Sequence, residues 1–219
     1  MKKCLIFTIL VVLIASAVCT SALANSEKTW PVIELNGKTT TLKRLSNSDE
    51  RRQAYYGPDK HYAQAGAYKP YKVVSIKALY QEGDYTLVDM DYQTAGKRCV
   101  YFRTSYLSGS SAPAVSSDRY PASTTVDLIP MCGPGLAYET VTQRKPSPYA
   151  DWDVISLVEK FAGSWEIYQA LQDRKYAVVL PQDSRIDVLF ETEGWVFAEF
   201  DCSIGLTRAW LPAEYVTAE

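Results

Sequence analysis

The chain has 219 residues, a length that suits one domain or two, because length alone sets only a loose expectation. Its formal charge is −2 at pH 7 and it contains a single histidine. Nucleic-acid-binding proteins normally gather positive charge on one surface, so this balance argues against a nucleic-acid partner. One histidine also leaves few routes to acid-base catalysis near neutral pH.

The first 24 residues have the three parts of a secretory signal. Lys2 and Lys3 precede an apolar run from Leu5 to Ile14, and Ala22-Leu23-Ala24 follows it. We predict cleavage after Ala24 and a secreted mature protein, with the cell wall as its expected place of association. The apolar run is shorter than the roughly 20 residues that cross a bilayer, and no longer one follows, so we expect no membrane span after cleavage. An uncleaved anchor and lipidation at Cys19 are the less favoured alternatives.

Loss of residues 1–24 removes two lysines and no acidic residue, which leaves 21 basic and 25 acidic side chains and a formal charge of −4. Three cysteines remain, Cys99, Cys132 and Cys202. An odd number in an exported chain permits one disulfide and one thiol, or three buried thiols. Their wide spacing does not match a zinc site, so we expect no metal and no cofactor.

Residues 25–50 are predicted to form an extension built on a β-hairpin. Two β-prone runs, 30–35 and 38–42, flank Asn36-Gly37. Asn-Gly is a strong signal for a tight hairpin turn because both turn residues take positive φ. The polar residues 46–50 are expected to form a loop.

The rest of the chain carries an internal repeat, which predicts a first unit at 51–108 and a second at 119–219. The segment 109–118 between them is rich in Ser, Ala and Pro and is interpreted as a linker. Three ordered matches support the repeat: Tyr56-Gly57-Pro58 to Tyr62 with Cys132-Gly133-Pro134 to Tyr138, Ala78-Leu79-Tyr80 with Val188-Leu189-Phe190, and Cys99-Val100-Tyr101-Phe102 with Arg208-Ala209-Trp210-Leu211.

Both units contain short strands with frequent turns, which is typical of small all-β domains. In the second unit we predict strands at 177–180, 186–191, 195–201 and 207–211. Apolar residues occupy both faces of 195–201, so we expect this strand to be buried on one side and covered on the other. The expected cover is a two-helix insertion at about 150–173, with one helix around Leu157 and a second that Ser164 caps.

Gly194-Trp195-Val196 and Ala209-Trp210-Leu211-Pro212-Ala213-Glu214-Tyr215-Val216 resemble the conserved stretches of bacterial SH3-type domains. The resemblance covers roughly residues 174–217 and extends loosely to 53–107. It implies a mainly β fold with two small SH3-like β-barrels in tandem, the second carrying the helical insertion. Members of that family are usually non-catalytic parts of exported proteins that bind cell-wall peptidoglycan or its peptide stems.

Aromatic side chains are the candidate ligand-binding residues, because exposed rings can stack on sugars or hold peptides. In the second unit the candidates are Trp195, Trp210, Pro212 and Tyr215. In the first unit they are Tyr55, Tyr85 and Tyr106. For the second-unit positions the favoured competing interpretation is that these side chains form the barrel core and its closure, given how much area aromatics bury.

No catalytic residue is predicted. His61 lies in a polar turn, and neither a nucleophile elbow nor a phosphate-binding loop occurs. The acid pairs Asp151 with Asp153 and Glu191 with Glu193 are the residues a glycoside hydrolase would use. They are more simply read as a helix start and a turn.

The sequence therefore predicts an exported, non-catalytic protein that binds peptidoglycan or a peptide ligand. The alternative is a structural subunit that binds another exported protein. A carboxylate-based glycoside hydrolase is the third and least favoured reading.

Overall fold

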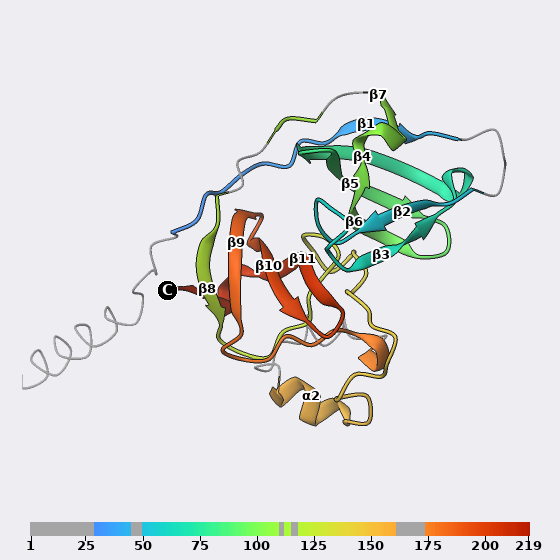
Figure 1. The fold of residues 1–219 in the computed structure, drawn as a ribbon. Helices are drawn as coiled ribbons and strands as arrows, with labels where there is room; N and C mark the ends of the chain where they lie inside the picture. Colours follow the sequence, from blue (N-terminus) through green and yellow to red (C-terminus); the bar gives the residue numbers. More distant parts are fainter. Residues whose placement is uncertain (1–28, 45–49, 110–111, 115–117, 161–173) are drawn as a thin grey trace, which may run out of the picture.

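The computed structural model describes residues 29–44, 50–109, 112–114, 118–160 and 174–219 (Figure 1). The predicted secretory signal and the predicted second helix lie outside these residues. The chain is mainly β and folds into two antiparallel sheets, which confirms the predicted fold class at that level. Pairings among the described strands give two open sheets, not closed barrels.

The first sheet contains seven strands, drawn mostly in blue and green in Figure 1. At its centre β4, β5 and β6 form a meander in which each strand pairs with the next. In spatial order the strands are β3 (Gln64–Tyr68), β2 (Arg52–Tyr55), β6 (Gly96–Arg103), β5 (Tyr85–Tyr92), β4 (Val73–Glu82), β1 (Lys38–Leu42) and β7 (Leu107–Gly109).

The second sheet contains five strands and is drawn largely in orange and red. Its meander is β9, β10 and β11, whose tight connections use left-handed backbone at Glu193, Gly194 and Gly205. In spatial order the strands are β11 (Gly205–Pro212), β10 (Trp195–Cys202), β9 (Arg185–Thr192), β8 (Tyr120–Thr124) and β12 (Val216–Ala218).

The two sheets repeat one plan. Each meander is followed by a 3-10 turn and a short strand: η2 (Thr104–Tyr106) and β7 in the first, η4 (Ala213–Tyr215) and β12 in the second. In each sheet an earlier strand lies between the meander and that short strand, β1 in the first and β8 in the second. Since β1 holds this place in the first sheet, residues 38–42 are part of the first unit and not of a separate extension.

The hairpin predicted at Asn36-Gly37 does not form. Strand β1 pairs with β4 and β7, whereas Val32 bridges Glu191 of the other sheet. The indole of Trp30 is buried, and its Nε1 donates to Glu191 Oε2 at 3.0 Å. The two predicted hairpin strands therefore pair with different sheets and not with each other, and the buried indole holds the first of them against the second sheet.

The two sheets exchange segments reciprocally. Before β1, the chain runs beside the end of β9, where Glu191 N donates to Pro31 O at 2.8 Å. Before β8, it runs beside the end of β4, where Gln81 N donates to Pro113 O at 2.9 Å. The segment 109–118 thus includes residues that pair with the first sheet, a role beyond that of a linker.

The repeated Gly-Pro turns make a second exchange. The turn at 56–63 belongs to the first unit, yet Arg208 N of β11 donates to Tyr56 O at 2.9 Å. The turn at 132–139 belongs to the second unit, yet Cys99 N of β6 donates to Cys132 O at 2.5 Å. Each meander is therefore extended by the turn of the other unit.

A shared core joins the sheets. Each sheet also has an apolar cluster of its own. The cluster of the first sheet includes Val88 and Phe102, and that of the second includes Val196 and Leu211. Between the sheets, Tyr80 of β4 packs edge-on against Phe190 and Phe197, with ring centroids 5.7 and 6.4 Å apart. On β10 the first sheet packs against the face that carries Phe197, which we had expected the helical insertion to cover, and Leu157 of that insertion belongs to the cluster on the opposite face.

The insertion contributes one described helix, α2 (Val154–Lys160). It begins after Asp153, whose Oδ1 accepts a hydrogen bond from Ser156 N at 2.9 Å, as an N-terminal cap does. Leu157 is buried, whereas Ile155 is exposed. Short 3-10 turns occur at η1 (Pro70–Lys72) and η3 (Arg174–Tyr176), and the strand predicted at 177–180 is reduced to isolated bridges from Ala177 and Leu180.

Candidate functional site

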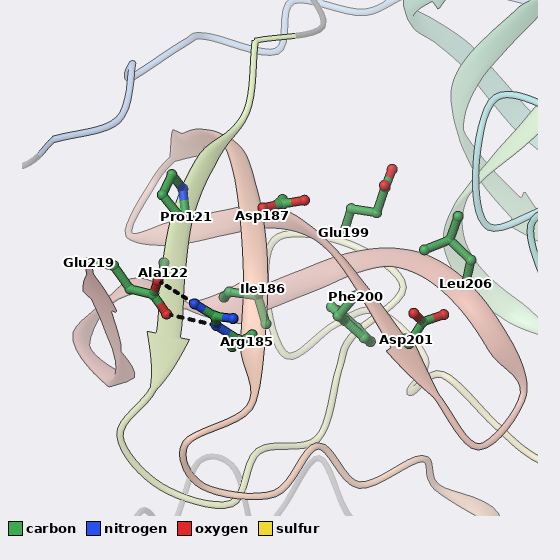
Figure 2. Close-up of a pocket in the computed structure, with 10 residues that line it drawn as sticks. All are labelled: Pro121, Ala122, Arg185, Ile186, Asp187, Glu199, Phe200, Asp201, Leu206 and Glu219. Carbon is green, nitrogen blue, oxygen red and sulfur yellow. Dashed lines mark hydrogen bonds and ion pairs between the residues drawn. The ribbon is translucent and has the colours of Figure 1, made fainter.

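A cavity of about 370 Å³ lies against the second sheet, and we call it the acidic cavity (Figure 2). Four carboxylates line it against one cation, Arg185. It is formed by neighbouring strands, so its shape depends on sheet register and not on a loop. The lining residues are Pro121, Ala122, Arg185, Ile186, Asp187, Glu199, Phe200, Asp201, Leu206 and Glu219.

One lining residue, Glu199, belongs to a buried ionic network. Arg208 on β11 lies opposite Glu199 on β10, and its Nε donates to Glu199 Oε2 at 2.7 Å. Its Nη1 and Nη2 donate to Glu82 of the first sheet at 2.6 and 3.2 Å. The remaining guanidinium hydrogens meet the hydroxyls of Tyr101 and Tyr62, each at 3.2 Å. All five donors of the guanidinium are thus engaged, and they join the two sheets.

The charge states follow from these contacts. Burial disfavours a charged Arg208, but Tyr101 and Glu82 outweigh that effect and raise its pKa above the ordinary value. Burial, together with the hydrogen bond that its hydroxyl donates to Glu199, raises the pKa of Tyr62 to about 12. Arg208 is therefore a cation and Tyr62 a neutral donor throughout the physiological pH range.

Both oxygens of Glu199 are occupied. Oε2 accepts from Arg208 and Tyr62, and Oε1 accepts from Arg119, whose side chain is 40% exposed. Glu199 itself is only 5% exposed. Its charge is consequently neutralised inside the protein, and it is held in one orientation.

The rim carries the charge that a ligand can reach. Asp187 is opposite Glu199 in the sheet, and Asp201 follows Glu199 by two residues on the same strand face. Asp187 is half-buried, 3.9 Å from Arg119, and Asp201 is exposed and makes no ion pair with any described residue. Glu219 is paired with Arg185 at 3.4 Å, the contact dashed in Figure 2. Two carboxylates thus remain weakly compensated at the mouth.

Comparison with known proteins does not assign the chain. No protein-family model, curated protein or solved structure matches it. Within the described residues, no group of three His, Cys, Asp or Glu side chains converges as metal ligands do, and no helix is long and apolar enough to span a membrane.

The predicted aromatic positions of the second unit are split between surface and core. Trp195 and Pro212 face each other across β10 and β11, and both are half-buried. Tyr215, in η4, is half-buried against the second sheet's core. Trp210 is fully buried between the sheets, 4.7 Å from Phe197, so it is closed to a ligand and follows the core interpretation.

In the first unit, Tyr55 and Tyr85 meet edge to face with centroids 6.1 Å apart. Tyr85 is buried and Tyr55 half-buried. Tyr106 lies elsewhere, beneath the guanidinium of Arg52 at 4.5 Å. The predicted aromatics therefore form separate small groups and do not make a continuous stacking row.

The acid pairs and the histidine that a hydrolase would use do not line the acidic cavity. Asp153 caps α2, Glu191 is buried beside Trp30, and Glu193 is exposed in the turn after β9. His61 is exposed and contacts Asp59 at 3.1 Å. Sequence reasoning missed Glu199 and Arg208, although strand alternation placed Glu199 on a face that we expected to be covered, where a carboxylate needs a partner.

The three described cysteines, Cys99, Cys132 and Cys202, are free thiols. Cys99 and Cys132 are buried, and Cys202 is half-buried. Burial raises the pKa of the Cys132 thiol to about 11, with a smaller opposing effect from Arg98. Of the two arrangements the sequence left open, the structure has unpaired thiols.

Proposed function

We propose that the chain is an exported, non-catalytic binding protein whose acidic cavity holds a peptide with a free amino group, with peptidoglycan stem peptides as the expected source. The observation that carries this proposal is the pair Asp187 and Asp201 at the mouth of the cavity. Both carboxylates line the same cavity, so an ammonium group held there can form charge-assisted hydrogen bonds with them.

The size and walls of the cavity support a small ligand. A volume of about 370 Å³ is within the range of small-molecule sites, and Pro121 and Leu206 offer apolar contact for an aliphatic stem. Arg208 fixes Glu199 in the wall of the cavity, so this part of the site is preorganised.

A binding role is favoured over catalysis because the one buried carboxylate of the cavity is held by three donors of the protein itself. Glu199 accepts from Arg119 at Oε1 and from Tyr62 and Arg208 at Oε2, so both of its oxygens are already engaged. A general acid or base needs to exchange a proton with its substrate.

The sequence supports export and a family resemblance. The three-part pattern of residues 1–24 supports a cleaved signal. We infer that both halves are SH3-type units, with the shared order of meander, 3-10 turn and short strand in support. The Gly194-Trp195 and Trp210-Leu211-Pro212 stretches add to that resemblance.

Sedimentation with purified peptidoglycan tests the proposal. Residues 25–219 are expected to pellet with the wall material, and binding should fall at least about tenfold in the double variant Asp187→Asn/Asp201→Asn, because two charge-assisted hydrogen bonds are weakened. The matched control is Asp84→Asn/Asp151→Asn, which removes two exposed carboxylates outside the cavity and should bind like the parent.

Chemical acetylation of the wall amines provides the second arm. Acetylated peptidoglycan should release the parent protein, because the ammonium charge is gone. A protein that stays in the supernatant, or that binds acetylated wall equally well, would overturn the proposal. Recovery of one exported protein in its place would favour the partner-binding alternative.

A further inference from the structure

A second cavity, about 720 Å³ in volume, lies at the tip of the β10–β11 hairpin, and we call it the basic cavity. It shares no lining residue with the acidic cavity, although the same hairpin contributes to both. Three chain segments form it, from the start of β3, the loop at 142–145 and the hairpin tip. The lining residues are Ala63, Gln64, Thr142, Gln143, Arg144, Lys145, Ser203 and Ile204.

Backbone pairing holds each wall in place. Ala63 N donates to Leu206 O at 2.8 Å, which ties the first unit's Gly-Pro turn to β11. Gln143 N donates to Tyr176 O at 2.7 Å, and the Ser203 hydroxyl donates to Gln143 Oε1. The cavity is therefore preformed by residues distant in sequence and does not depend on one loose loop.

Its charge is opposite to that of the chain as a whole. Arg144 and Lys145 are adjacent and exposed, and neither forms an ion pair with a described residue. The mature chain has a formal charge of −4, so two uncompensated cations in one cavity are a local reversal. The other polar groups of the lining are amides and hydroxyls, which can both donate and accept hydrogen bonds.

We propose that the basic cavity binds a polyol that carries an oxyanion. Arg144 and Lys145 hold the oxyanion through charge-assisted hydrogen bonds. Gln64, Thr142 and Ser203 bind the neighbouring hydroxyls, and Ile204 with Ala63 contacts the carbon skeleton. This site is separate from the acidic cavity, and it stands whether or not that cavity binds an amine.

Calorimetric titration of residues 25–219 in low salt tests the proposal with two anionic probes and their neutral counterparts. The probes are glycerol 3-phosphate with glycerol, and glucuronate with glucose. At least one anion should bind, its neutral counterpart should bind at least about tenfold more weakly, and raising the salt should weaken binding. Binding of the phosphate alone would identify a phosphorylated polyol, and binding of glucuronate alone a sugar acid.

The variant Arg144→Gln/Lys145→Gln should weaken the anion at least about tenfold, since both charged donors are lost. Its matched control, Arg51→Gln/Lys77→Gln, removes one arginine and one lysine from exposed positions on the first unit and should bind like the parent. Both variants change exposed side chains only, and equal urea midpoints would verify their folding. No binding of either anion, or equal loss in the two variants, would overturn the proposal.

Discussion

Replacement of Arg208 by methionine should be among the most destabilising single changes in this chain. The Arg208 side chain is fully buried and pairs with Glu199, which is 5% exposed, and with Glu82, which is 22% exposed. Methionine fills much of the same volume but leaves one carboxylate buried and another partly buried without their cation. Breaking a buried ion pair in this way costs about 3–5 kcal/mol.

Arg119→Met is a control at the same carboxylate. Arg119 also contacts Glu199, but its side chain is 40% exposed, so its loss should cost about 1 kcal/mol or less. Urea unfolding followed by tryptophan fluorescence measures both, because Trp210 lies in the core between the sheets. With an m-value of roughly 2 kcal/mol/M, the Arg208→Met midpoint should fall by about 2 M and the Arg119→Met midpoint by less than about 0.5 M.

The double variant Arg208→Met/Glu199→Gln should be more stable than Arg208→Met alone, because it leaves no unpaired charge at position 199. Equal midpoint shifts for Arg208→Met and Arg119→Met would refute the reasoning. Such a result would mean that the burial of an arginine does not determine how much its pairing with Glu199 contributes to the free energy of unfolding.

Three further outcomes are expected. Gly133→Ala should lower the free energy of unfolding by more than about 2 kcal/mol, because an added Cβ would lie 1.9 Å from the Tyr138 ring. Gly83→Ala should cost only about 1 kcal/mol, because Gly83 has positive φ but open space around it. Equal urea midpoints for the two variants would contradict this. Burial disfavours ionised Asp127, but its hydrogen-bond donors outweigh burial and lower the pKa of its carboxyl. The variant Asp127→Asn should therefore be less stable than the parent at pH 7, and the difference in thermal midpoint should close as the pH falls below about 3.9. A difference that stays constant with pH would show that the charge of Asp127 does not contribute to stability. Among the thiols of residues 25–219, Cys202 should react first with a thiol reagent, with the buried pair reacting only in urea; three fast thiols in the native protein would contradict the described burial.

The reciprocal exchange of segments makes the two sheets one cooperative body. Residues 31–33 and 113–114 each run along the other unit's meander, and so does each Gly-Pro turn. Separate domains would normally meet through a modest interface and move relative to each other. Here backbone hydrogen bonds and a shared aromatic core cross the junction, so we expect a single unfolding transition.

Local sequence patterns determined the elements of this protein. Alternating apolar residues predicted β9, β10 and β11 within a few residues, and the mainly β class followed from them. Asp153 with the apolar spacing around Leu157 predicted α2. These features depend on neighbours a few residues apart, so they can be read along the chain.

Tertiary structure alone decided where those elements meet. The hairpin predicted at Asn36-Gly37 does not form because the preceding residues pack against the second sheet, where Trp30 is buried beside Glu191. That contact joins residues 161 apart in the chain, so no local pattern predicts it. For Trp210 the sequence left core and ligand contact as alternatives and favoured core, and the packing of the first sheet on β10 decided for core. The acidic cavity depends on long-range pairing too. Arg208 fixes Glu199 only because strand register and Glu82 of the first sheet bring the three charges together. The energy of a buried charge is set by such partners, which the spacing of residues along the sequence does not reveal.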